Sequence, residues 1–172
     1  PSEYKPLTEK STSWAYKKAI DYLVGQRKID MKLIQKYNIG YTDGGDRRYR
    51  IIIPSYNSKG IVNYFEARTF LDSVKKTYMK PESPDKNDII FNESNINWDL
   101  PVYLVEGVFD MLRLPNAIPL LGKSPSEYLK SMLLKHNCRV VICLDEDAVD
   151  DAYDFYNELT SLGLDTYFID MT

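Results

Sequence analysis

The chain has 172 residues, of which 44% are hydrophobic and 27% are charged, and its formal net charge is −3. This composition is typical of a globular protein and excludes a disordered or low-complexity chain. No apolar run approaches the roughly 18 residues of a transmembrane helix, and no basic, apolar leader opens the sequence, so we expect a cytoplasmic protein without a membrane partner.

Charge is distributed unevenly along the chain. Residues 1–98 contain 17 Lys and Arg against 12 Asp and Glu, whereas residues 99–172 contain 5 against 13. A basic half can bind a nucleotide or an anionic polymer and an acidic half can bind a cation, although mixed charges that only face solvent are the commoner explanation. Because the residue pattern also changes near Trp98, we predict one domain over 1–98 and a second over 99–172.

The first domain is predicted to be a small α+β subdomain that opens with two helices. The polar first dozen residues predict a frayed start. An amphipathic pattern predicts a helix from Trp14 to near Gly25, and Asp30 is a suitable N-cap for a second helix that ends at Tyr37.

The rest of this domain is predicted to consist of turns and strands. Residues 38–45 predict an exit turn. Two runs rich in β-branched and aromatic residues, 49–54 and 61–70, flank a turn that ends at Gly60, and together they predict a hairpin. Residues 72–100 lack a long periodicity and predict short strands joined by loops.

The second domain alternates apolar runs with helical patterns. The predicted strands are 102–105, 117–121, 139–144 and 164–169, and the predicted helices are 107–114, 125–136 and 148–162, the middle one capped by Ser124. This βαβαβαβ order predicts an α/β fold whose parallel sheet has flanking helices on both faces. Ligands then belong at the carboxyl ends of the strands.

Carboxylates stand at two of these strand ends. Glu106 directly follows the first strand, with Gly107 favouring a close turn and Asp110 one helical turn further on. Asp145 and Asp147 follow the third strand. Such neighbouring charges repel unless a cation lies between them, and Mg²⁺ prefers oxygen ligands of this kind. The alternative is that they are solvated loop ends, which we prefer for the further acids on the helix that follows.

Basic and aromatic residues gather around the hairpin and the segment after it. This set can contact phosphates and stack on a base, although each member taken alone is more commonly a surface charge. Its members are Arg50, Arg68, Lys76, Tyr78 and Lys80. Lys123 follows a glycine at a strand end and faces either a phosphate or solvent.

These motifs resemble a known family. Residues 105–110, 121–124 and 144–148 resemble the signature of the TOPRIM domain, which is shared by topoisomerases, bacterial-type primases and some nucleases. Residues 50–54, 59–68 and 78–82 resemble the subdomain that precedes TOPRIM in bacterial and phage DNA primases. The helical opening also resembles that family, so the likeness spans nearly the whole chain, and a phage-encoded form is the most similar.

The resemblance implies the catalytic core of a DNA primase, which synthesises RNA primers on a single-stranded DNA template from ribonucleoside triphosphates. It implies that Glu106 is the catalytic acid or base, that Asp145 and Asp147 bind Mg²⁺, or Mn²⁺ in its place, and that Asp110 supports them. Arg68 and Tyr78 match positions that contact the nucleotide or the template and primer, and Arg50 is a weaker match. A replicative helicase would bind through regions outside this sequence.

The chain departs from the family pattern at several positions. Thr77 replaces the lysine that precedes the tyrosine, so Lys76 or Lys80 would have to substitute for it. No lysine closely follows Phe91, and Glu146 replaces a glycine between the metal-binding aspartates.

The third acidic motif of the family lies beyond the last strand, so the TOPRIM domain is C-terminally incomplete here. Two alternatives therefore stay open. One is a TOPRIM nuclease, and the other is a non-catalytic nucleic-acid-binding module.

Overall fold

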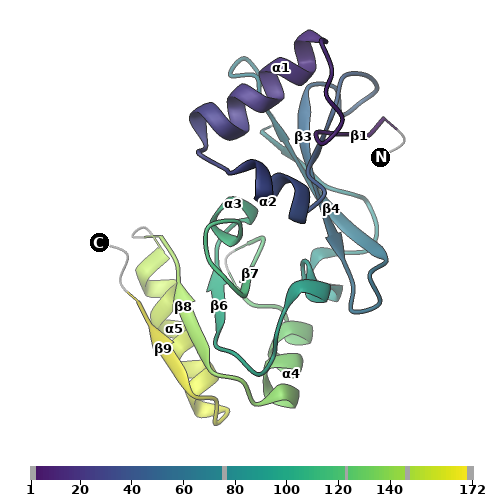
Figure 1. Cartoon of the computed structure of the whole chain (residues 1–172). Helices are drawn as coiled ribbons and strands as arrows, with labels where there is room; N and C mark the ends of the chain where they lie inside the picture. The colour runs from purple at the N-terminus through teal and green to yellow at the C-terminus, as the bar shows by residue number, and fades with distance from the viewer. Residues whose placement is uncertain (1–2, 75–76, 123, 146–147, 170–172) are drawn as a thin grey trace. The chain divides into compact units, whose positions relative to one another are not determined.

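The computed structural model describes residues 3–74, 77–122, 124–145 and 148–169, and Figure 1 shows the chain. The chain forms two compact units, Pro1–Ser55 with Val62–Ser83, and Tyr56–Ile61 with Pro84–Thr172. The predicted domain boundary between residues 98 and 99 stays a prediction. Among the described residues, no helix has both the length and the apolar character that crossing a bilayer requires.

The first unit contains a five-stranded sheet. Its strands are β1 (Lys5–Pro6), β2 (Gly40–Thr42), β3 (Arg50–Tyr56), β4 (Val62–Thr69) and β5 (Tyr78–Met79), in the order β1-β2-β3-β4-β5. The predicted hairpin is confirmed as β3 and β4. Asn57 N–H donates to the Ile61 carbonyl at 2.9 Å, and Gly60 has a φ of +74°, which glycine adopts without strain.

The predicted helical pair is confirmed, with one local difference. Helix α1 (Trp14–Ile20) begins after Ser13, and α2 (Met31–Lys36) begins after Asp30, whose carboxylate accepts a hydrogen bond from Lys32 N–H at 2.8 Å. Between them, η1 (Asp21–Gln26) is a π-helix rather than a continuation of α1. The amphipathic pattern predicts helix here but does not distinguish the wider π turn from an α turn.

Two predicted irregular segments are instead strands. Lys5–Pro6 was expected to fray and 38–45 to form a turn, but β1 and β2 pair antiparallel, with Lys5 opposite Tyr41. Leu7 and Ile39 are fully buried beside them. Strands of two and three residues are too short to show alternation, so the sequence carries no periodic signal for this pairing.

The segment from residue 72 to residue 100 also differs from the prediction. After β5 it contains two 3₁₀ helices, η2 (Lys86–Asp88) and η3 (Glu93–Asn95), in place of further strands. The Asp85 carboxylate caps η2 by accepting a hydrogen bond from Asn87 N–H at 2.9 Å. Such side chain to backbone bonds favour a turn over a strand ladder.

The second unit contains the predicted parallel sheet. Its strands are β6 (Val102–Val105), β7 (Ala117–Pro119), β8 (Val140–Cys143) and β9 (Thr166–Phe168), in the order β7-β6-β8-β9. The helices are α3 (Val108–Met111), α4 (Glu127–His136) and α5 (Val149–Ser161). The alternation of strands and helices is therefore confirmed. The N-cap of α4 is Ser126, whose Oγ accepts from Leu129 N–H at 3.1 Å, and not Ser124 as predicted.

The core of this unit lies between the sheet and helices α4 and α5. Leu104 of β6 and Ile142 of β8 pack in one buried cluster with Leu133 of α4 and Leu159 of α5. The residues that alternate with them in the strands are also buried, among them Val105, Val141 and Cys143. Burial of both faces explains why these strands are continuous apolar runs.

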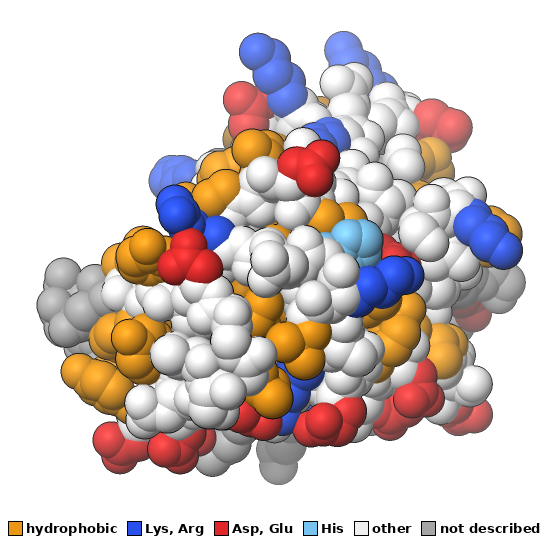
Figure 2. All heavy atoms as spheres, turned by 90° about the horizontal axis from the view of Figure 1, so that it is seen from below, with side chains coloured by type: hydrophobic (Ala, Val, Ile, Leu, Met, Phe, Trp, Pro, Cys, Tyr) orange, Lys and Arg blue, Asp and Glu red, His pale blue; other side chains and the backbone are white. Residues whose placement is uncertain are grey.

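An aromatic stack lies at the end of the sheet where the parallel strands begin, opposite their carboxyl ends. Trp98 lies against His136 with ring centroids 4.5 Å apart and an interplanar angle of 8°. Figure 2 shows the histidine on this face among hydrophobic and charged side chains.

Candidate functional site

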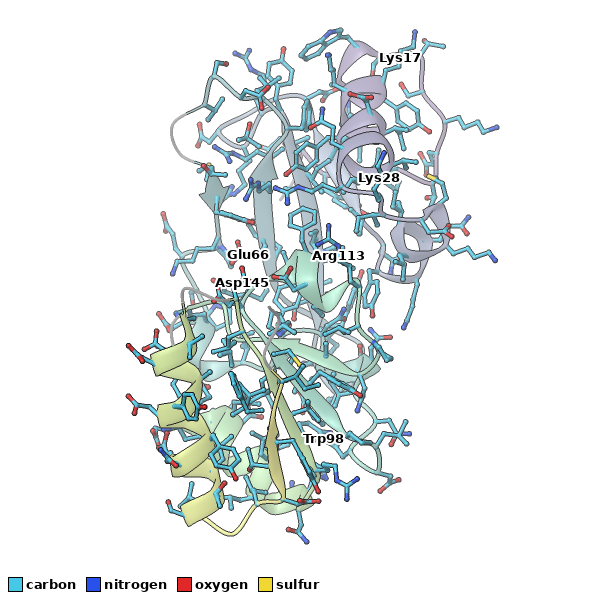
Figure 3. The ribbon with its side chains drawn as sticks, turned by 90° about the vertical axis from the view of Figure 1, so that its left-hand side faces the viewer. Lys17, Lys28, Glu66, Trp98, Arg113 and Asp145 are labelled. Atoms are coloured by element: carbon cyan, nitrogen blue, oxygen red, sulfur yellow. The ribbon has the colours of Figure 1, made fainter. Side chains whose placement is uncertain are left out.

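The carboxyl ends of β6 and β8 bring two carboxylate residues together. The strands are parallel neighbours with Val105 opposite Cys143, so Glu106 and Asp145 leave the sheet at the same edge. The backbone N–H of Asp145 donates to Glu106 Oε1 at 3.3 Å. Figure 3 shows Asp145 at this end of the sheet and Trp98 at the other.

The two acids differ in their exposure to solvent. Glu106 is half-buried and Asp145 is exposed. Two unit charges about 4 Å apart repel by about 1 kcal/mol in water and by about 4 kcal/mol near a protein surface. The amide hydrogen bond to Glu106 offsets part of this cost, and a cation would offset more.

Asp110 fixes the turn that follows Glu106. Its Oδ2 accepts a hydrogen bond from Gly107 N–H at 3.3 Å, which caps the short helix α3. Gly107 has an extended backbone, with φ −131° and ψ 169°, so the turn does not require the conformational freedom of glycine that the sequence suggested. Asp110 therefore stabilises the backbone turn directly after Glu106.

The loop after β7 holds the backbone of Glu106. Leu121 N–H donates to the Glu106 carbonyl at 3.1 Å, directly after the bond from Leu120 to Val105. Leu121 has a φ of +56°, a left-handed conformation that is unfavourable for a residue with a side chain. Sequence reasoning missed Leu121, because nothing in a leucine before a glycine indicates this conformation.

The donor atoms at this edge suit a hard divalent ion. Glu106 and Asp145 offer carboxylate oxygens, and Mg²⁺ is commonly held by one or two carboxylates, with waters and substrate phosphates completing its shell. Within the described ranges, no group of three or more His, Cys, Asp or Glu is arranged to hold a metal ion. Asp147, the other predicted metal ligand, lies outside the described residues.

Arg68 and Tyr78 form a pair in the first unit. They are directly opposite each other on β4 and β5, and the Arg68 guanidinium lies over the Tyr78 ring at 4.6 Å from its centroid. Arg68 Nε is buried without a hydrogen-bond partner, while Tyr78 is 42% exposed. Burial raises the pKa of the Tyr78 phenol, against the lowering effect of Arg68, so the phenol is neutral at neutral pH.

The other predicted basic residues have different environments. Arg50 is buried, and its Nη1 donates to the Thr77 carbonyl at 2.9 Å, which ties β3 to the residue before Tyr78. Burial lowers the pKa of the Arg50 guanidinium. Lys80 is exposed. Lys76 and Lys123 lie outside the described residues.

Comparisons with known proteins give matches only among solved structures. No family model matches the chain, and no curated protein does. The structure of the Aquifex aeolicus primase, with its zinc-binding and RNA polymerase domains, matches 93% of this chain with a TM-score of 0.77 at 19% identity. This chain spans 50% of that structure.

Two further matches agree with this one. The RNA polymerase domain of Mycobacterium tuberculosis primase DnaG has a TM-score of 0.75 at 16% identity, over 94% of this chain and 71% of that one. A DnaG primase catalytic domain bound to single-stranded DNA has a TM-score of 0.68 at 18% identity, over 84% of this chain and 60% of that one. The chain therefore has the mixed α/β fold of the bacterial DnaG primase catalytic core.

Proposed function

We propose that this chain is the catalytic core of a DNA primase that synthesises RNA primers on single-stranded DNA with the help of Mg²⁺. The observation that supports this most is the hydrogen bond between Asp145 N–H and the Glu106 carboxylate, at the strand edge of a primase-core fold. The fold alone hosts several activities, so the proposal depends on this site.

In the proposed reaction, Glu106 acts as the acid or base. Its carboxylate accepts the proton of the primer 3′ hydroxyl, whose oxygen forms a bond to the α-phosphorus while the bond to pyrophosphate breaks. The bond from the Asp145 amide fixes the orientation of that carboxylate. Asp145 and Asp147, supported by Asp110, would hold Mg²⁺ or Mn²⁺, which when bound stabilises negative charge on the phosphates.

The first unit supplies the proposed contacts to nucleic acid and nucleotide. Arg68, Lys76 and Lys80 would bind phosphates, and Tyr78 would contact a base or sugar. Arg50 would act by holding the strand before Tyr78. Lys123 would face a phosphate from the second unit. We propose that the protein acts in the cytoplasm of a bacterium or phage-infected cell, with a replicative helicase as partner of the parent protein.

Primer synthesis on a single-stranded DNA template tests this proposal. We expect Glu106→Gln and Asp145→Asn each to lower ribonucleotide incorporation roughly 100-fold or more. Asp154→Asn, an exposed acid on α5, is the matched control and should leave incorporation unchanged. Incorporation by Glu106→Gln at the wild-type rate would contradict the proposal.

Two further measurements separate the alternatives. Degradation of labelled single-stranded DNA without nucleotides would indicate a TOPRIM nuclease instead. A failure to bind Mn²⁺ at millimolar concentration, together with retained DNA binding, would indicate a non-catalytic module.

A further inference from the structure

We propose that Lys86 is a positioning residue for Glu106, acting through the loop that follows β7. Lys86 belongs to no motif that the sequence singles out, and it lies 20 positions before Glu106 in the sequence. The inference rests on the proposed role of Glu106, and it concerns contacts within the second unit only.

The fold delivers Lys86 to this loop from a short, anchored segment. Lys86 is the first residue of η2, which Asp85 caps, and η2 packs against α4. Ile90 and Phe91 follow, and each is only 1% exposed. Because the residues after η2 are fixed in the core, the Cα and Cβ atoms of Lys86 have a defined position.

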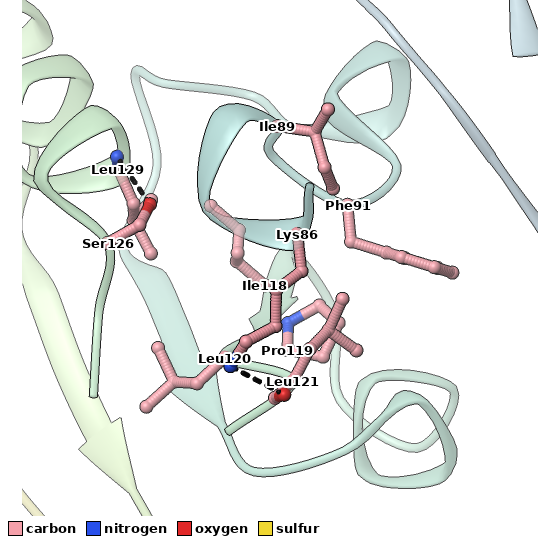
Figure 4. Close-up of a pocket in the computed structure, with 9 residues that line it drawn as sticks. All are labelled: Lys86, Ile89, Phe91, Ile118, Pro119, Leu120, Leu121, Ser126 and Leu129. Carbon is pink, nitrogen blue, oxygen red and sulfur yellow. Dashed lines mark hydrogen bonds between the residues drawn. The ribbon is translucent and has the colours of Figure 1, made fainter. Parts of the chain in front are cut away.

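Lys86 holds the carbonyl group of Leu121, the residue whose N–H is bonded to Glu106. Its Nζ donates to the Leu121 carbonyl at 2.9 Å, as Figure 4 shows. The N–H of the same residue, Leu121, donates to the Glu106 carbonyl at 3.1 Å. Leu121 is therefore bound at both of its backbone polar groups, by Lys86 on one side and by Glu106 on the other.

The conformation of Leu121 explains why such an anchor is needed. At a φ of +56° its Cβ crowds the following carbonyl, so the residue relaxes towards negative φ unless its neighbours prevent it. A hydrogen bond from a charged donor is stronger than one between neutral groups. Loss of the ammonium group would free the Leu121 carbonyl, so that the φ angle of Leu121 can relax and shift the N–H that is bonded to the Glu106 carbonyl.

Gly122 gives independent support for this contact. A Cβ added at Gly122 would collide with Lys86 Nζ, and the nearest other atom is Lys86 Cε. The backbone of Gly122 does not lie in the left-handed region, so conformation does not require glycine here. The ammonium group of Lys86 therefore occupies the space that a side chain at position 122 would take.

The experiment combines five variants, one of them a control, with primer synthesis as the readout. Lys86→Met should lower kcat roughly tenfold or more, because a small displacement of a catalytic group is costly. The KM for the nucleotide should stay within about twofold, since Lys86 contacts no substrate in this proposal. Lys86→Arg should restore most of kcat, because its guanidinium can also donate to the Leu121 carbonyl.

The remaining variants test the contact itself. Gly122→Ala should lower kcat as Lys86→Met does, since its methyl group displaces the ammonium group. The double variant should be no slower than Lys86→Met alone, because both changes remove one interaction. Lys135→Met, an exposed lysine on α4, is the matched control and should keep the wild-type kcat.

Hydrogen exchange of the Leu121 amide separates this inference from the proposed function. Lys86→Met should speed that exchange in the protein without nucleotides, whether or not the chain makes primers. Unchanged exchange, or a double variant slower by the product of both single effects, would overturn the role of Lys86. Wild-type activity in Glu106→Gln would instead overturn the role of Glu106.

Discussion

At the scale of single residues, Arg50 and Arg68 illustrate two different uses of a guanidinium group. Arg50 is 5% exposed and its Nη1 is bonded to a backbone carbonyl, whereas Arg68 stacks on the exposed ring of Tyr78. The first arrangement favours stability, and the second places a half-buried cation against an aromatic ring that is exposed to solvent and within reach of nucleic acid.

This difference predicts separable effects of substitution. Arg50→Ala should lower the free energy of unfolding by about 1–3 kcal/mol, because the Thr77 carbonyl loses its charged donor. Arg68→Ala should weaken binding of a labelled single-stranded oligonucleotide by about tenfold and leave unfolding less affected. Urea unfolding and fluorescence anisotropy measure the two effects. Equal losses of stability and affinity in both variants would contradict the distinction.

The two buried cysteines predict a pH dependence of stability. Burial raises the pKa of Cys138 and Cys143 above the ordinary value of 9.0. Above about pH 9 the unfolded chain loses these protons while the folded chain keeps them, so unfolding becomes easier as pH rises. The loss should reach at most about 1.4 kcal/mol per pH unit for each thiol, until the folded-state pKa is passed.

Urea unfolding at pH 8 and at pH 10 measures this effect. Cys138→Ala/Cys143→Ala should show a smaller loss than the wild type between the two pH values. The cavity that each substitution creates is present at both pH values, so it does not contribute to the difference. An equal loss of stability in both proteins would show that ionisation of these thiols is not its cause.

At the scale of elements, the caps show how far local sequence determines a boundary. Asp30 caps its helix as the sequence predicts, but α4 begins after Ser126 rather than Ser124. Both serines flank Pro125, and both are good N-caps in isolation. The choice between them depends on where Leu129 and Leu133 must lie to reach the core, which one segment alone does not reveal.

Substitution of the two serines tests this assignment. Ser126→Ala should destabilise the protein by about 1 kcal/mol, because the Leu129 amide loses its acceptor. Ser124→Ala should change stability by less than about 0.5 kcal/mol. Thermal unfolding of the two variants gives the comparison, and a larger loss for Ser124→Ala would refute it.

The predictability of the other elements depends on their length and burial. Strands β6, β7 and β8 of the parallel sheet are apolar runs because residues on both of their faces are buried, and this signal is strong in the sequence. Strands β1, β2 and β5 have two or three residues and pair with distant partners, so their formation depends on tertiary contacts. The 3₁₀ helices η2 and η3 are equally short, so a periodic pattern in the sequence does not distinguish them from the short strands that were predicted there.

The candidate site was predictable to the extent that it depends on sheet topology. Glu106 and Asp145 each follow an apolar strand, and parallel neighbours bring such positions to one edge. The contacts of Lys86 and Leu121 were not predictable, because they depend on a backbone angle and on a packing position far away in the sequence.

At the scale of the whole molecule, each compact unit contains one tryptophan. Trp14 packs edge-on against Tyr49 in the first unit, and Trp98 stacks on His136 in the second. Replacing either one with phenylalanine leaves a single fluorescent reporter for the other unit. Unfolding of the two units can therefore be followed separately in otherwise similar proteins.

A core substitution in the second unit should show whether the units unfold together. Leu104→Ala should lower the stability reported by Trp98 by about 2–5 kcal/mol, because it removes a fully buried side chain between the sheet and the helices. We expect a smaller change in the transition reported by Trp14. Equal shifts of both transitions would instead show one cooperative unit.

The hydrogen bond between Asp145 N–H and Glu106 Oε1 couples two events at this edge of the sheet. The Glu106 side chain cannot turn towards an arriving ion or hydroxyl group without loosening its hold on that amide. A change in the orientation of the Glu106 carboxylate therefore also changes what holds the backbone of Asp145, just beyond β8.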